Sequence, residues 1–232
     1  MRVNSYLLEL RLRRALGRFR PLETPVLPLD GPRVAYVPVP KAANSSLRTA
    51  LMTAVGREDA IGEDVHRATQ SLLRPAPAFF AQDRSDWFVF TVVRDPVARA
   101  LSAWRNKLID PDEIFRPLRR MGVTERLSFE DFLGVCLDWP AWALNDHFMP
   151  QSLYLSQVLD RPELQVLHVE TLARDWPRVR DALRAGGANP QEALGRRNTT
   201  GQRPGAELTQ TARARLGRLY GADFDRFGYD RP

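Results

Sequence analysis

The sequence contains almost no lysine, although it is strongly basic. Lys41 and Lys107 are the only lysines among 34 basic residues, which leaves 34 − 2 = 32 arginines, and the net charge is +6. A positive surplus of this size favours anionic ligands such as nucleic acid, acidic lipid, phosphate-bearing molecules or sulfated polymers. A lysine in such a chain indicates a place where a compact point charge is used instead of the planar arginine fork.

Cysteine and long apolar runs are also scarce. The single Cys136 excludes an internal disulfide and provides no metal-binding cluster, so we expect no metal. The longest apolar runs, such as WFVFTVV at 87–93, are far shorter than the roughly 18 residues of a membrane span. The beginning of the sequence lacks the continuous apolar core of a secretory signal. We therefore expect a cytoplasmic protein without a transmembrane segment.

The sequence does contain an alternation of strand-like and helix-like segments. Apolar runs at 33–39, 87–93 and 164–170 predict buried strands. Helices are predicted at 4–19, 44–55, from Pro96 onward, at 128–137, 150–159, 171–185 and 207–220. This order predicts an α/β fold, a three-layer P-loop-like arrangement with a central parallel sheet flanked by helices. We expect one domain over 1–232, in which 1–28 form a basic helix and a proline-rich connector.

Glycine is missing from a loop that is otherwise organised like a phosphate-binding loop. The stretch VPVPKAANSSLRTAL at 37–51 reads as strand, loop and helix, and a helix start offers N–H groups and a positive dipole to an anion. The candidate ligands are Lys41, the small Ala42 and Ala43, and the side-chain donors of Asn44, Ser45 and Ser46. We expect these residues to line the helix start without positive φ angles. The alternative is an ordinary helix N-cap by Asn or Ser.

A second candidate loop follows the second predicted strand, in VVRDPVARALSAWRNK at 92–107. Arg94 stands at the strand end and is able to bind a phosphate through two hydrogen bonds, while Ser102 lies two helical turns further on. Arg99 and Arg105 are expected to flank them. The alternative is a surface ion pair of Arg94 with the next residue. Because ligands of open α/β sheets bind at the carboxyl ends of the strands, both loops are predicted to belong to one site.

Taken together, the two loops resemble the cofactor-binding signatures of the sulfotransferases that use 3′-phosphoadenosine 5′-phosphosulfate (PAPS). VPVPKAANSSLRTAL is similar to their 5′-phosphosulfate loop. FTVVRDPVARALSAWRNK is similar to the 3′-phosphate motif of carbohydrate sulfotransferase family 2 and its bacterial relatives. RRNTTG at 196–201 and LYGADFDRFGY at 219–229 extend the resemblance. It implies transfer of a sulfuryl group from PAPS to an acceptor hydroxyl on a carbohydrate, by in-line displacement and without a metal.

The resemblance implies a role for each matched residue. Lys41 would neutralise charge on the bridging oxygen and the leaving 5′-phosphate. The backbone of 43–46 and the side chains after Ala43 would hold the phosphosulfate. Arg94 and Ser102 would hold the 3′-phosphate, helped by Arg197 or a neighbour. The sequence AANSS departs from the residues that many members carry, which leaves open which hydroxyl contacts the sulfate.

The acceptor hydroxyl also needs a general base, and the chain has three histidines. His168 alternates within a predicted strand and is interpreted as structural. Some family 2 relatives, among them glycosaminoglycan 2-O-sulfotransferases, take their base from the interval that contains His66. His147 resembles a family segment that faces the acceptor. His66 is the predicted base and His147 the alternative, with the carboxylates Glu63 and Asp64 as further candidates.

Two other classes of function are weighed against this interpretation. A P-loop kinase or NTPase requires a glycine-rich loop with its lysine after the glycines, whereas Lys41 precedes the small residues. A non-enzymatic binder of nucleic acid or acidic membrane accounts for the charge, but no nucleic-acid motif is present, so we expect no nucleic-acid partner. A member that binds without turnover is disfavoured by the intact Lys41, Arg94 and Ser102.

The basic helix predicted at 4–19 carries leucines on one stripe and arginines around the rest. The leucines are Leu7, Leu8, Leu12 and Leu16, and the arginines opposite them are Arg11, Arg13 and Arg14. We predict that this stripe packs on the core of the protein. The alternative is that the helix contacts acidic lipid.

Overall fold

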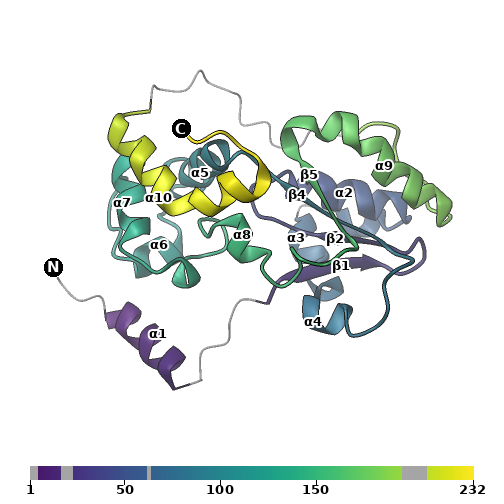
Figure 1. The fold of residues 1–232 in the computed structure, drawn as a ribbon, viewed down its shortest axis with the longest axis horizontal. Coiled ribbons are helices and arrows are strands. Elements are labelled where there is room, and N and C mark those ends of the chain that lie inside the picture. The colour runs from purple at the N-terminus through teal and green to yellow at the C-terminus, as the bar shows by residue number, and fades with distance from the viewer. Residues whose placement is uncertain (1–4, 17–22, 62–63, 195–207) are drawn as a thin grey trace. The chain divides into compact units, whose positions relative to one another are not determined.

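The computed structural model describes residues 5–16, 23–61, 64–194 and 208–232, which form two compact units (Figure 1). The sheet unit contains the described residues within 23–94 and 155–194, and the helical unit contains 5–16, 95–154 and 208–232. Each unit is described by itself, and the assignment of 1–232 to one domain stays a prediction. Within these described ranges, no helix combines the length and the apolarity that crossing a membrane requires.

The sheet unit is built on five strands in the order β3-β1-β2-β4-β5 (Figure 1). The strands are β1 Pro25–Leu29, β2 Val34–Val37, β3 Arg74–Pro75, β4 Phe88–Val93 and β5 Leu164–His168. β2, β4 and β5 correspond to the three predicted strands and run parallel, with Val37 opposite Thr91 and Val93 opposite His168. The predicted α/β fold with a parallel core flanked by helices is therefore confirmed.

β1 and β3 are antiparallel additions to this core that the sequence pattern did not reveal. β1 lies in the segment predicted as a proline-rich connector, yet four of its five residues are buried. It pairs antiparallel with β2 and with β3, and β3 spans only two residues. Because β3 is this short, β1 is nearly an edge strand, where the missing N–H groups of Pro25 and Pro28 are tolerated. The prolines that indicated a connector thus belong to a strand.

Helices α2 (Asn44–Ala54) and α9 (Leu172–Ala185) cover one face of the sheet. Their apolar side chains form one core with the sheet, made of Leu47, Leu51, Trp176, Val179 and Leu183 against Leu27, Tyr36, Phe90, Val92 and Leu167. α9 ends at Gly186, which packs directly on Pro32. A Cβ added to Gly186 would lie 2.1 Å from the Pro32 Cα, so this position requires glycine.

The segment between α2 and β4 is made of short elements. They are η1 Glu58–Ile61, α3 Val65–Ala68, η2 Gln70–Leu72 and α4 Ala76–Phe79, and a further turn, η5 Val169–Thr171, follows β5. At Thr69, α3 passes into the 3₁₀ turn η2. The Thr69 hydroxyl donates to the Val65 carbonyl at 2.7 Å, a local bond with which threonine competes against continued helix.

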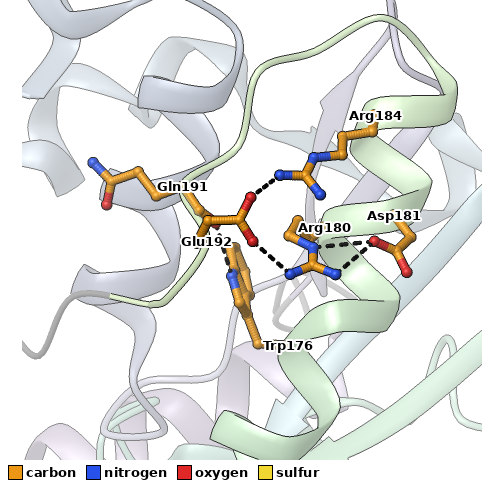
Figure 2. Close-up of polar contacts among 6 residues, drawn as sticks. All are labelled: Trp176, Arg180, Asp181, Arg184, Gln191 and Glu192. Atoms are coloured by element: carbon orange, nitrogen blue, oxygen red, sulfur yellow. Dashed lines mark hydrogen bonds and ion pairs between the residues drawn. The ribbon is translucent and has the colours of Figure 1, made fainter.

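The residues that follow α9 form hydrogen bonds and ion pairs with side chains of α9 (Figure 2). The Trp176 indole donates to the Gln191 carbonyl at 3.2 Å, and the Glu192 carboxylate accepts from Arg180 at 2.8 Å and from Arg184. The Asn189 amide also donates to the Ala54 carbonyl at the end of α2, at 2.8 Å. Because these contacts are mostly exposed, the buried Trp176 is the main anchor of this segment.

The helical unit contains no strand within its described residues. Its elements are α1 Ser5–Ala15, α5 Pro96–Trp104, the π-helical turn η3 Arg105–Ile109, α6 Arg116–Arg120, α7 Phe129–Leu137, η4 Ala141–Ala143, α8 Gln151–Tyr154 and α10 Gln210–Phe227. α10 packs on α7 and α5, and the helix expected at 150–159 is only the short α8. Non-helical angles at Tyr220 put a kink into α10, so the helix expected to end near 220 is followed directly by a second helical segment that ends at Phe227.

Buried polar groups hold the helical unit together. Asp223 of α10 is fully buried, and its carboxylate accepts from the Gln151 and Ser152 amides at 2.7 and 2.8 Å, which caps α8. Arg99 is 1% exposed and donates to the Asp146 and Met149 carbonyls at 2.9 Å each. Burial lowers the pKa of its guanidinium. Arg99 was expected to flank a phosphate, but here it serves as a structural cross-link.

Candidate active site

The predicted phosphosulfate loop lies at the carboxyl edge of the parallel strands. β2 ends at Val37 beside β4, and the Thr91 hydroxyl donates to the Val37 carbonyl at 2.8 Å. The residues between β2 and α2, here called the 38–43 loop, leave this edge, and Arg94 follows β4 at the same edge. The location expected from strand order is thus confirmed.

The backbone of the 38–43 loop differs from the expectation. Lys41 and Ala43 have φ angles of +67° and +56°, so the prediction of a loop without positive φ is wrong. The chain passes from β2 into α2 within six residues, and with no glycine available two other residues take left-handed conformations. Each such conformation costs about 1–3 kcal/mol and persists only where its surroundings enforce it. Ala42 between them is fully buried, which explains its small side chain.

The start of α2 is not an ordinary side-chain cap. Its N-cap residue is Ala43, which has no side-chain acceptor for the first N–H groups, and Asn44 and Ser45 belong to the first helical turn. The interpretation as an N-cap by Asn or Ser is therefore wrong. A helix start without a side-chain cap, next to a lysine, is the chemistry that an anion site uses.

Asn44 is oriented by two side chains that the sequence analysis missed. Its Oδ1 accepts from the Arg48 Nε at 3.0 Å and lies 3.5 Å from the Tyr36 hydroxyl. Arg48 is itself buried, and its Nη1 donates to the Thr69 hydroxyl at 2.6 Å, which joins α2 to the end of α3. The spacing of four residues between Asn44 and Arg48 on one helix was the available signal.

The structure brings the predicted base to the loop. The Ser45 hydroxyl and the His66 Nε2 are 2.7 Å apart. His66 is held by Asp64, whose Oδ1 accepts from the amides of His66 and Arg67 at 2.9 and 3.3 Å and caps α3. Asp64, a further candidate for the base, thus positions His66, whereas Glu63 lies outside the described residues.

Arg94 is tied to the lysine of the loop. Its Nη1 donates to the Lys41 carbonyl at 3.2 Å, so the end of β4 and the left-handed turn are joined directly. The carboxylate of Asp95 caps α5 by accepting from the Ala98 amide at 2.7 Å. Ser46, on the same helix turn as Ser45, is 8% exposed.

The remaining predicted phosphate ligands are Ser102 and Arg197. Ser102 belongs to the helical unit, where it lies on α5 and is 8% exposed. Its joint action with Arg94 on one phosphate stays a prediction. Arg197 lies outside the described residues, and its role also stays a prediction.

His147, the alternative base, lies in the helical unit. Its Nδ1 is 2.7 Å from the Asn145 Oδ1 and 2.9 Å from the Asp146 Oδ1, so Nδ1 carries a proton that is donated to these oxygens. Burial raises the pKa of Asp146, but the hydrogen bond and charge of His147, with the charge of Arg99, hold that pKa below its ordinary value. Neither hydrogen-bond partner of this ring was expected from the sequence. His168 ends β5 opposite Val93, in keeping with a structural residue.

The chain is similar to known sulfotransferases. The profile of the sulfotransferase family matches residues 29–230 and so runs through both units. Carbohydrate sulfotransferase 14 of Danio rerio is 29% identical over 143 residues, which are 54% of this chain and 39% of that protein. A solved sulfotransferase structure from Alicyclobacillus acidocaldarius is 18% identical, covers 86% of this chain and 87% of its own, and superposes with a TM-score of 0.38.

The extent of the family match decides between the classes of function weighed above. It covers most of the chain and includes the 38–43 loop, Arg94 and Ser102. The kinase and the non-enzymatic alternatives gain no support from these comparisons, whereas the resemblance to sulfotransferases is confirmed. The chain belongs to the sulfotransferase family.

Proposed function

We propose that this sulfotransferase transfers the sulfuryl group of PAPS to a hydroxyl of a carbohydrate acceptor. The observation that carries the proposal is the 38–43 loop, where a left-handed lysine precedes an uncapped helix start and Arg94 binds the lysine carbonyl. The similarity to a carbohydrate sulfotransferase over part of the chain supports a carbohydrate acceptor. A cytoplasmic location stays part of the proposal, and fractionation of the native cells tests it.

The residues of the site fit the donor by their chemistry. Lys41 and Arg94 supply positive charge, Ser45 and Ser46 supply hydroxyl donors, and the start of α2 supplies backbone N–H groups. When bound, PAPS supplies the sulfuryl group and a bisphosphate leaving group. Arg94, Ser102 and Arg197 are proposed to hold the 3′-phosphate.

Lys41 and His66 are proposed to carry out the chemistry. Sulfuryl transfer resembles phosphoryl transfer, in which positioning and charge stabilisation dominate, so the Lys41 ammonium stabilises charge that develops on the bridging oxygen. His66 takes the proton from the acceptor hydroxyl, a contribution of about 10²- to 10⁴-fold in rate. The hydrogen bond between Ser45 and His66 supports this assignment, because it orients the ring at the loop. A sulfuryl group carries less charge than a phosphoryl group, so we propose that no metal is needed.

A transfer assay with sulfate-labelled PAPS tests the proposal. The acceptor panel contains glycans, lipid alcohols and small alcohols, and we expect labelled product on glycans. Lys41→Ala is expected to abolish transfer, while Arg57→Ala, an exposed basic residue beyond α2, keeps it. Thermal unfolding of each variant shows whether the fold is intact. Wild-type turnover in Lys41→Ala overturns the mechanism, whereas product only on non-glycan alcohols overturns the carbohydrate acceptor alone.

A further inference from the structure

The exposed apolar side chains of the protein are concentrated on α1. Among the described residues, four large hydrophobic side chains are exposed, and three of them are Leu8, Leu12 and Leu16, at 57–58%. They recur every four residues and therefore lie along one face of the helix. Leu16 directly follows α1 and keeps the helical hydrogen bonding, because its amide donates to the Leu12 carbonyl at 2.9 Å. These three residues are called the leucine stripe. The prediction that Leu7, Leu8, Leu12 and Leu16 pack on the core is wrong for the three exposed leucines, whereas Leu7 is partly buried.

The opposite face of α1 is the one that packs. The Tyr6 ring lies 6.1 Å from the Trp139 ring, Arg14 lies 4.4 Å over the Trp142 ring, and Arg120 of α6 lies 5.4 Å over Tyr6. Tyr6 and Leu10 also line a cavity of about 260 Å³ in the helical unit. Because this face is held by aromatic contacts, the leucine stripe points away from the unit. Aromatic attachment of one face thus explains why the leucines are exposed.

Arginines lie on both sides of the leucine stripe, with Arg11 alone on one side and Arg13 paired with Glu9 on the other. Arg11 and Arg13 stand three residues from Leu8 and Leu16 respectively, which places them about 60° from the stripe around the helix axis. α1 carries three arginines and one acidic residue, Glu9, whose carboxylate is 2.6 Å from Arg13. Arginine stems extend along an apolar surface and keep their charge at its polar boundary. The leucine stripe with Arg11 and Arg13 beside it is therefore suited to the boundary between an apolar and a polar phase.

We propose that α1 docks the protein on an anionic lipid surface, with the leucine stripe inserted between headgroups and the flanking arginines on the phosphates. Charge complementarity selects this occupant, because an apolar protein partner gains nothing from arginines along both borders, and a second copy of α1 would bring like charges together. Three leucines and a few arginines give reversible binding, since each arginine near an acidic membrane and each inserted leucine contributes only modestly to the binding free energy.

Vesicle sedimentation of the full chain tests this proposal. We expect binding to vesicles of phosphatidylcholine mixed with phosphatidylglycerol at least about tenfold above binding to phosphatidylcholine alone, and weaker binding in high salt. The triple variant Leu8→Gln, Leu12→Gln, Leu16→Gln is expected to lose about tenfold or more of this binding, since glutamine keeps helix propensity but removes apolar area. Leu153→Gln is the matched control, because Leu153 is the fourth exposed hydrophobic residue and lies on α8.

Circular dichroism and thermal unfolding of both variants establish that the fold is kept. Equal vesicle binding by the triple variant and the wild type overturns the proposal, as does equal loss in Leu153→Gln. Absence of wild-type binding to anionic vesicles also overturns it. A dimer in light scattering that the triple variant abolishes, without lipid binding, identifies a second copy as the occupant and rejects lipid. The sulfate-transfer assay in solution is independent of these outcomes.

Discussion

Lys41 and Ala43 hold backbone angles that glycine adopts freely and other residues adopt at a cost. The hydrogen bond from Arg94 to the Lys41 carbonyl is one of the contacts that enforce the turn. A glycine loop would reach the same geometry with more freedom before a ligand binds. The alanine and lysine therefore keep the loop preformed, which is useful where catalysis depends on positioning more than on chemistry by side chains.

Kinetics of two histidine variants distinguish the possible bases. We expect His66→Ala to lower kcat by about 10²- to 10⁴-fold, because the acceptor proton then has no positioned recipient. His147→Ala is expected to stay within a few-fold of wild type and is the matched control. Initial rates across pH with labelled PAPS provide the measurement. Near-normal turnover in His66→Ala together with a large loss in His147→Ala would transfer the assignment to His147.

Local sequence patterns predicted the parts of the site that lie within one segment. The strand, loop and helix around Lys41, and Arg94 at the end of β4, follow from periodicity and from the matched motifs. The hydrogen bonds from Arg48 to Thr69 and from His147 to Asp146 were missed. The first joins residues 21 apart, which no local pattern encodes, and the second depends on the buried surroundings of an ordinary-looking Asp-His pair.

Elements of the sheet unit depend on close backbone contacts as much as on apolar burial. α9 reaches the turn between β1 and β2 through Gly186, whose position leaves no room for a Cβ beside Pro32. The helix itself was predicted from its period, and the strand β1 was not, because its prolines are typical of connectors. Proline excludes a strand only where its missing N–H would have to donate a hydrogen bond to a neighbouring strand. Whether such a strand pairs there cannot be read from the local sequence.

A substitution at the end of α9 tests this packing. We expect Gly186→Ala to lower the free energy of unfolding by about 1–3 kcal/mol, because the new methyl group overlaps the Pro32 backbone and α9 must shift. Gly31→Ala is the matched control, since an added Cβ there meets nothing within 4 Å. Urea unfolding followed by circular dichroism measures both. Equal stability of the two variants would contradict the close contact.

At the scale of the whole molecule, acid stability depends on a partly buried carboxylate. The pKa of Asp146 is held below its ordinary value of 3.8 by His147 and Arg99 against the opposing effect of burial. A carboxylate whose pKa is lower in the folded state stabilises that state at pH values above its unfolded-state pKa. This contribution is lost as pH falls through the folded-state pKa. Acid therefore removes stability from the protein partly through this group.

The pH dependence of unfolding tests this role. We expect Asp146→Asn to have a lower Tm than wild type near neutral pH and to converge with it once the pH has fallen through the lowered folded-state pKa of Asp146, so the Tm of the variant falls less steeply in acid. Asp138→Asn, an exposed carboxylate of the same unit, is expected to follow the wild-type curve. Differential scanning fluorimetry across pH provides the curves. An Asp146→Asn curve parallel to wild type at all pH values would exclude the contribution.

Two hydrogen bonds join α2 to α3 and its C-cap residue Thr69, and both span the same sequence separation. Ser45 bonds His66 and Arg48 bonds Thr69, each pair 21 residues apart and each one turn along its helix from the other. One contact belongs to the candidate active site and the other is a buried brace. A rotation of either helix that changes the contact between Arg48 and Thr69 therefore also moves His66 away from Ser45. In relatives, substitutions at positions 48 and 69 should accordingly covary, and should accompany changes at 45 and 66.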